Sequence, residues 1–187
     1  MDAAALEGGF ADAPRDASLA FRGLMNVMAR PGRIEQVTGA APPPPLSIAA
    51  GTVLLTLADA DTPVYLAGSA NTPEVRGWLA FHTGAPMAGP ARATFAVGEW
   101  DALLPLHAFP VGTPDYPDRS TTLIVECDRL EAQGSLLTGP GIKDTATLSL
   151  PDPDALRANA ALFPLGLDVF LTCGDRIAAL PRSTRIA

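Results

Sequence analysis

The stretch FPLGLDVFLTCGDRIAALPRSTR, residues 163–185, decides the fold that this sequence predicts. Two apolar runs, at 167–173 and 177–180, flank a Gly-Asp turn, which is a pattern typical of a β-hairpin. The first run is almost continuously apolar, as expected for a strand buried on both faces of a sheet. Asp168 lies near its start, and Arg182 follows the second run. The sequence therefore predicts a buried hairpin at the centre of a sheet, with charged residues at its ends.

Composition limits the classes of protein to which the chain can belong. Its 187 residues suit one domain, and 48% hydrophobic with 18% charged residues is typical of a globular protein with a real core. The formal charge is −7, from 13 basic and 20 acidic residues. This balance argues against a nucleic-acid groove, since phosphate contacts are made mainly by Lys and Arg. We therefore expect no nucleic-acid partner.

The cysteines and the N-terminal residues give no sign of a redox, zinc, secreted or membrane protein. Cys127 and Cys173 lie in or beside expected strands without redox or zinc spacing, so we interpret them as buried structural thiols. Residues 1–16 are acidic and lack the basic and apolar regions of a signal peptide. No apolar run approaches the ~20 residues needed to cross a bilayer. The expected location is the cytoplasm, without membrane contact.

The first helix is expected at residues 14–30. Its apolar side chains recur at the i, i+3, i+4, i+7 spacing of a single helix face: Phe21, Leu24, Met25 and Met28. The sequence Arg-Pro-Gly ends this helix, because proline disfavours helical geometry in its predecessor and glycine permits a turn. The four side chains are therefore interpreted as one apolar face.

Three further stretches show helical patterns. At 72–84, Thr72 is a candidate N-cap and Pro73 occupies the first helical position. At 152–163, an Asp-Pro pair opens the last helix in the same way. Residues 47–58 fit either a buried helix or a strand by periodicity, and their length of about a dozen residues favours a helix.

Strands are expected in short apolar or β-branched runs between these helices. Besides the hairpin they are 33–37, 64–67, 93–97, 121–125 and 135–137. Strands alternate with helices early in the chain, and two hairpin-like pairs close it. The predicted architecture is therefore an α/β protein with a mixed β-sheet and helices outside the sheet.

The glycine-rich stretch TGPGIKD, residues 138–144, suggests a phosphate loop, because glycines let backbone amides approach an anion. It fits neither standard pattern, since Ile142 separates Gly141 from Lys143 and a third glycine is missing. A type II turn with Pro-Gly at its centre is the alternative. Lys143 is the only lysine, hence the one candidate for a Schiff base, and its place on a turn favours an exposed, ordinary amine.

The remaining candidate side chains each allow two interpretations. Asp59 and Asp61 could bind a metal or act as a carboxylate pair, and they equally suit a polar turn after a helix. His82 could be a base or a hydrogen-bonded packing residue. Asp168 and Arg182 could hold a ligand or form an internal ion pair that fixes the hairpin. The two histidines show no ligand spacing and no serine lies in a nucleophile elbow, so the residues alone predict no metal centre and no active site.

Seven segments, taken in order, resemble a known family. They are FRGLMNVMARPG at 21–32, TVLLTLADADTPVYL at 52–66, LAFHTGAPM at 79–87, ATFAVG at 93–98, TTLIVE at 121–126, LLTGPGI at 136–142 and the stretch at 163–185. Together they resemble the PhnH family, a subunit of the bacterial carbon–phosphorus lyase core complex. The resemblance spans nearly the whole chain and rests on the order of the segments rather than on one motif.

This resemblance implies a role in the use of organic phosphonates as a phosphorus source. PhnH subunits join other subunits in a core complex that supports displacement of adenine from ATP by a phosphonate, giving a ribose 1-phosphonate 5-triphosphate. A radical iron–sulfur subunit later breaks the carbon–phosphorus bond. Two cysteines without cluster spacing cannot hold such a centre, so we expect that chemistry to belong to another chain.

The resemblance also implies a fold and an assembly. The expected fold is a three-layer α/β/α arrangement with a mixed sheet, similar to the large domain of pyridoxal-phosphate-dependent transferases but without that cofactor. It would form one domain over residues 1–187. The isolated subunit is expected to be a homodimer, and no cofactor is expected.

The leading hypothesis is a non-redox subunit of a transferase complex, which acts by scaffolding and by binding a phosphonate or nucleotide group. The alternative is a stand-alone small α/β transferase with a carboxylate, histidine and arginine site. Candidate ligand-binding residues lie in segments that carry the resemblance and near the ends of expected elements. They are Asp59, Asp61, His82, Gly139, Gly141, Asp168 and Arg182. No catalytic residue is assigned.

Overall fold

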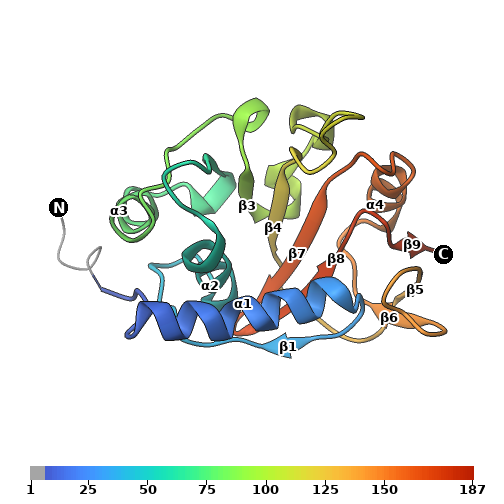
Figure 1. Ribbon diagram of the computed structural model, residues 1–187, viewed down its shortest axis with the longest axis horizontal. Helices are drawn as coiled ribbons and strands as arrows, with labels where there is room; N and C mark the ends of the chain where they lie inside the picture. Colours follow the sequence, from blue (N-terminus) through green and yellow to red (C-terminus); the bar gives the residue numbers. More distant parts are fainter. Residues whose placement is uncertain (1–6) are drawn as a thin grey trace.

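The computed structural model describes residues 7–187, and the first six residues of the acidic N-terminal stretch lie outside this part. Its centre is a six-stranded sheet in the order β1-β8-β7-β4-β3-β2 (Figure 1). The strands are β1 (Glu35–Gln36), β2 (Val64–Leu66), β3 (Phe95–Glu99), β4 (Thr122–Glu126), β7 (Asp168–Cys173) and β8 (Arg176–Leu180). Neighbours from β2 to β7 pair in parallel, and β8 is antiparallel to both β7 and β1. The sheet is therefore mixed, as the sequence predicts.

The hairpin at 163–185 forms as expected. Strands β7 and β8 pair from Val169 opposite Leu180 to Cys173 opposite Arg176. Gly174 makes the turn with φ +62°, a conformation that side chains with a Cβ rarely adopt. The four central residues of β7 are buried, because β4 and β8 flank the strand and both faces of the sheet are covered.

Helices cover one face of the sheet. They are α1 (Ala13–Ala29), α2 (Ile48–Leu57) and α3 (Pro73–His82), and Figure 1 shows α1 and α2 in front of the strands. Their buried side chains form one apolar cluster with Ile124 and Phe170 of the sheet. Helix α2 is apolar all round and is buried from residue 49 to residue 54, which is the pattern of a core helix rather than a surface helix. The helical interpretation of 47–58 is confirmed.

The other face carries a mixed layer. It contains α4 (Pro153–Ala160) and a three-stranded antiparallel sheet of β5 (Ser135–Thr138), β6 (Ala146–Leu148) and β9 (Arg185–Ile186). Short 3₁₀-helices at Trp100–Leu103 and Leu106–Ala108 complete it. The sequence predicts only β5 of this small sheet, because strands of two or three residues are too short to show alternation. This second layer is thus only partly helical, so the structure confirms an α/β fold with a mixed sheet but adds a small antiparallel sheet that the α/β/α expectation did not contain.

Each of the four α-helices within residues 7–187 begins with a capping side chain. Asp12, Ser47, Thr72 and Asp152 each accept a hydrogen bond from the backbone N–H three residues later. Helix α4 ends at Ala160, earlier than the sequence predicts. Among the described residues, no helix is both long and apolar enough to cross a membrane.

Helix α1 forms where expected but buries a different side. Ala20, Leu24 and Val27 face the core, whereas Phe21 and Met25 are 48% and 52% exposed. The expected set, with Phe21 and Met25, and the buried set, with Ala20 and Val27, both contain residues at helical spacing around Leu24. Periodicity alone therefore does not distinguish the two sets. Packing against α2 and β8 selects the side that carries Ala20 and Val27. The prediction of a single apolar face was therefore wrong for Phe21 and Met25, which remain outside, whereas Leu24 and Met28 pack against the core as expected.

Candidate functional site

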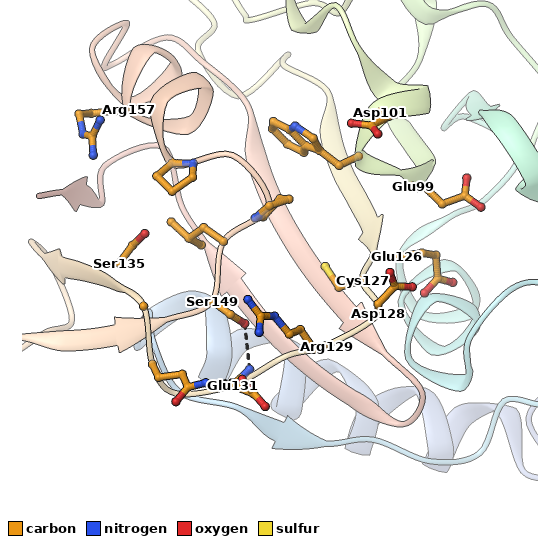
Figure 2. A pocket seen from close by; sticks show the side chains of 16 residues that line it. Glu99, Asp101, Glu126, Cys127, Asp128, Arg129, Glu131, Ser135, Ser149 and Arg157 are labelled. Carbon is orange, nitrogen blue, oxygen red and sulfur yellow. Dashed lines mark hydrogen bonds between the residues drawn. The ribbon is translucent and has the colours of Figure 1, made fainter.

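The carboxyl ends of the parallel strands open onto a cleft of about 980 Å³ (Figure 2). Strands β3 and β4 end at Glu99 and Glu126, which lie opposite each other in the sheet register. The far wall is formed by Ser135, Ser149 and the start of α4. In open α/β sheets, ligands bind in the crevice outside the carboxyl ends of the strands. This position makes the cleft the candidate functional site.

The charges that line the cleft are mainly negative. The carboxylates are Glu99, Asp101, Glu126, Asp128 and Glu131, and the guanidinium groups are Arg129 and Arg157. Figure 2 shows Glu99, Asp101, Glu126 and Asp128 on one side and Arg157 on the opposite side. Such a surface repels a bare phosphate or phosphonate and favours hydrogen-bond donors or cationic groups.

Glu126 is already engaged by the protein. Its Oε1 accepts a hydrogen bond from the Ser47 backbone N–H at 2.7 Å, and its Oε2 accepts one from the Thr172 hydroxyl at 2.8 Å. Burial raises the pKa of this carboxyl, the two hydrogen bonds oppose that rise, and the charge of Glu99 adds to it. The carboxylate thus occupies the N-terminus of α2, where backbone amides would otherwise attract an anion.

Glu99 is the more accessible of the paired carboxylates. The Ser69 hydroxyl donates to its Oε1, and this hydrogen bond lowers the pKa of Glu99. A Cβ added at Gly68 would lie 2.7 Å from Glu99 Oε2, and the backbone there has φ +53°. Glycine therefore lets the chain approach this carboxylate closely. Glu99 is ionised, exposed and held by one hydroxyl, so it can accept further hydrogen bonds from a ligand.

One cysteine thiol lines the cleft. Cys127 directly follows β4, where its backbone N–H donates to Thr172 O at 2.8 Å, and this register places it next to Cys173. Its Sγ donates to the carbonyl of Val125 at 3.6 Å. Burial raises the pKa of Cys127 to about 12, with smaller contributions from the neighbouring thiol and carboxylates. The thiol is therefore protonated at neutral pH, which suits a structural residue and not a nucleophile.

Asp168 and Arg182 lie at the opposite end of the parallel strands, where β7 begins. Arg182 Nε donates to Asp168 Oδ1 at 3.1 Å and Nη2 donates to Oδ2 at 2.6 Å. The backbone N–H of Arg182 also donates to Oδ1 at 2.9 Å, and Nη1 donates to Pro117 O at 2.7 Å. This is the internal ion pair that the sequence offered as one interpretation. It joins the hairpin to the loop before β4.

Gly139 and Gly141 belong to one tight turn. The Ile142 N–H donates to Gly139 O at 3.1 Å, and Gly141 has φ +81°, as the third residue of a type II turn requires. A Cβ added at Gly141 would lie 2.0 Å from Ala29 O at the end of α1. The glycines therefore let this turn pack against α1, and neither lines the cleft.

Asp59, Asp61 and His82 make local contacts. Asp59 Oδ1 accepts hydrogen bonds from the Asp61 N–H at 2.9 Å and the Thr62 hydroxyl at 3.1 Å, which is the geometry of a polar turn. His82 Nε2 lies 3.2 Å from Glu7 O, and its ring is 5.3 Å from that of Trp78, centroid to centroid. Within residues 7–187, no group of three or more His, Cys, Asp or Glu side chains is arranged to hold a metal. None of these three residues lines the cleft.

Comparison with known proteins decides the family. A family model described as "Bacterial phosphonate metabolism protein (PhnH)" matches residues 8–187. The chain belongs to the PhnH family. It is 44% identical over 188 residues to the alpha-D-ribose 1-methylphosphonate 5-triphosphate synthase subunit PhnH of Rhizobium meliloti, covering 96% of this chain and 94% of that protein. It is 30% identical over 181 residues to the putative C-P lyase subunit protein HtxG of Stutzerimonas stutzeri, covering 93% and 87%. The family resemblance of the seven segments is confirmed.

In this PhnH-family chain, sequence reasoning missed the residues of the cleft. Of its seven candidates, the structure joins Asp168 to Arg182 and places the two glycines in one turn. A usable signal existed, since Glu99 and Glu126 each follow closely on an expected strand. Acidic residues just after successive strands of a parallel sheet meet at one edge. The sequence alone did not show that these strands are parallel neighbours.

Proposed function

We propose that this chain is a non-redox subunit of a complex that processes organic phosphonates. In that complex it supports the formation of a ribose 1-phosphonate 5-triphosphate from ATP and a phosphonate. The observation that carries this proposal is 44% identity, over nearly the full length of both chains, to a protein named as a subunit of ribose 1-methylphosphonate 5-triphosphate synthase. The second relative, named as a putative C-P lyase subunit, supports the same pathway.

The geometry of the cleft supports a binding and scaffolding role for this subunit. Cys127 is protonated, and both oxygens of Glu126 accept hydrogen bonds from the protein itself. Neither side chain is poised to attack a substrate or to take a proton from one. Glu99 and Asp101 remain exposed and offer acceptors. The ligand part that fits these acceptors is a donor-bearing group of a nucleotide, such as a ribose hydroxyl or a base amino group, rather than a bare phosphonate.

Further proposals concern the location, domain organisation, oligomeric state and fold relationship of the subunit, and its ligand contacts. The chain works in the cytoplasm, as one domain over residues 1–187 and as a homodimer when isolated. Its α/β sheet is related to the large domain of pyridoxal-phosphate-dependent transferases and works without that cofactor. The seven sequence candidates remain proposed ligand contacts, of which Asp168 and Arg182 already satisfy each other.

Co-expression with the other lyase subunits tests the proposal. A tagged copy of this chain should retain those subunits through affinity and size-exclusion steps. Deletion of its gene should abolish growth on methylphosphonate and leave growth on inorganic phosphate unchanged, which is the matched control. Failure to co-purify, together with normal growth of the deletion strain on methylphosphonate, would overturn it. Turnover of ATP and phosphonate by the isolated chain would instead favour the stand-alone transferase.

A further inference from the structure

Helix α1 carries an exposed side that no described element covers. In Figure 1 the helix runs along the lower edge of the molecule, in front of the sheet. Its exposed residues between positions 18 and 30 are Ser18, Leu19, Phe21, Arg22, Met25, Asn26, Ala29 and Arg30. We call this set the outer α1 surface. Its large apolar members, Leu19, Phe21 and Met25, are 48–55% exposed.

The composition of the outer α1 surface differs from that of the whole chain. The chain has 20 acidic and 13 basic residues, yet this surface contains two arginines and no acidic residue or lysine. Aromatic residues, Met and Arg are enriched at protein–protein interfaces, whereas Lys, Asp and Glu are depleted there. Single exposed apolar residues need no explanation. Three on one helix, beside two arginines, have the composition of an interface, and carboxylates border it where Asp16 and Glu35 line a pocket together with Leu19 and Asn26.

The arginines of this surface make no ion pair within the described residues. The ion pairs found between residues 7 and 187 involve Arg33, Arg157 and Arg182, and none involves Arg22 or Arg30. Arg22 lies next to Phe21 in the chain and three residues before Met25, so its charge stands beside the apolar side chains. A complementary partner therefore combines acidic with apolar side chains.

We propose that the outer α1 surface binds an acidic amphipathic helix from another subunit of the phosphonate-processing complex. Phe21 and Met25 would pack against its apolar side, and Arg22 and Arg30 would pair with its carboxylates. The inference rests on the proposed function. Helix α1 has 17 residues, about 25 Å in length, which offers a straight ridge for a second helix. One helix contact is smaller than the roughly 800 Å² per partner of a stable interface, so this contact is one part of a larger one.

Two other occupants fit the surface less well. A symmetric contact between two copies centred on Arg22 would bring the arginines of one α1 close to those of the other, and like charges repel. An anionic membrane would attract the arginines locally. However, the chain as a whole carries −7, and this net charge opposes adsorption to a negative surface.

The test uses the co-expressed complex and three variants of the full-length chain. Phe21→Ser/Met25→Ser removes the apolar contact, and Arg22→Glu reverses the charge. Phe81→Ser is the matched control, because Phe81 is a 54% exposed aromatic residue on α3. The first two variants should weaken retention of the other subunits by about tenfold or more, as expected for central interface residues. Arg22→Glu should also reduce the salt dependence of binding. Phe81→Ser should bind like the wild type.

A photo-reactive amino acid at position 25 identifies the occupant. A cross-link to an acidic helical segment of another subunit supports the proposal. A cross-link to a second copy of this chain, or co-sedimentation with phosphatidylglycerol vesicles that the double variant abolishes, overturns it. Unfolding midpoints in urea equal to wild type confirm that the variants fold. If the wild type co-purifies and both variants do so equally well, only the surface assignment falls; if the wild type fails to co-purify and the deletion strain grows normally on methylphosphonate, the proposed function falls with it.

Discussion

The two ends of the parallel strands use charged residues differently. At the amino end, Asp168 and Arg182 satisfy each other through three hydrogen bonds. At the carboxyl end, Glu99 and Glu126 stand at the edge of a cleft with an excess of carboxylates. The amino end therefore contributes stability, while the carboxyl end keeps acceptors free for binding. The Asp168–Arg182 pair belongs to the hairpin at 163–185, which carries part of the family resemblance. The candidate site, however, lies at the carboxyl end.

The two glutamates at the carboxyl end, Glu126 and Glu99, have different roles. Glu126 is engaged by Ser47 and Thr172 and caps α2, whereas Glu99 has one hydroxyl partner and faces solvent. Of two acids opposite each other in the register, one supports the fold and the other is free for a ligand. Substitutions at Glu126 and at Glu99 should separate these two roles.

The largest expected effect concerns the reactivity of Cys127. Its pKa is raised from 9.0 to about 12, so the thiolate fraction in the folded protein is lower by about a thousandfold. Labelling with iodoacetamide at mildly alkaline pH should modify Cys127 only when the chain is unfolded in urea. Peptide mass spectrometry of native and unfolded samples measures this, with Cys127→Ser identifying the peptide. Equal rates in the two states would show that the carboxyl end holds a reactive thiol, contrary to the proposed binding role.

At the amino end, Arg182→Ala should lower the free energy of unfolding by about 3 kcal/mol, because it leaves a largely buried carboxylate without its partner. The side chains of Arg182 and Asp168 are only 12% and 26% exposed. Urea denaturation measures the change. Asp154→Ala is the matched control, since the side chains of the Arg157–Asp154 pair are 46% and 91% exposed and the pair should contribute at most about 1 kcal/mol. Similar losses in the two variants would contradict the structural role of the amino end.

Much of the fold was predictable from local patterns, while the site was not. The caps at Thr72 and Asp152, the closing hairpin and the type II turn all depend on residues close together in the chain, and these predictions are confirmed. The buried side of α1 depends on packing against α2 and β8, so periodicity through Phe21 and Met25 misassigned it. Tertiary contacts, rather than residue spacing, determine which of two apolar sets on one helix is buried.

The cleft depends on strand order, which a single sequence does not show. Glu99 and Glu126 are 27 positions apart and meet only because β3 and β4 are parallel neighbours in register. The sequence candidates were chosen near the ends of expected elements, a rule that selects turns as readily as sites. Asp59 and Asp61 illustrate this, since their contacts are those of a turn.

Substitution of Glu126 separates its capping role from its charge. Glu126→Ala removes the acceptor for the Ser47 N–H and should cost about 1–2 kcal/mol. Glu126→Gln keeps both contacts, because the Thr172 hydroxyl can donate to Val125 O at 3.0 Å and accept from the amide. Burial raises the folded pKa of Glu126, so the wild type binds this proton more tightly when folded. Relative to Glu126→Gln, its stability should fall as pH rises from the ordinary glutamate value through the raised pKa. A rise over that window would contradict the burial argument.

Glu99 should show the smallest effect and the opposite sign. The Ser69 hydroxyl lowers its folded pKa, so the folded state favours the ionised form. Its contribution is present above the ordinary glutamate pKa and is lost as pH falls through the lowered value. Because the carboxylate is mostly exposed, solvent limits the contribution to a few tenths of a kcal/mol, roughly the range of a surface pair. Urea titrations of the wild type, Glu99→Gln and Ser69→Ala across acidic pH measure it. The two variants should show the same loss of pH dependence, because Glu99→Gln removes the titrating carboxyl and Ser69→Ala removes the hydrogen bond that lowers its pKa. A Glu99 effect as large as that of Glu126 would mean that both acids support the fold, and that the carboxyl end keeps no acceptor free for a ligand.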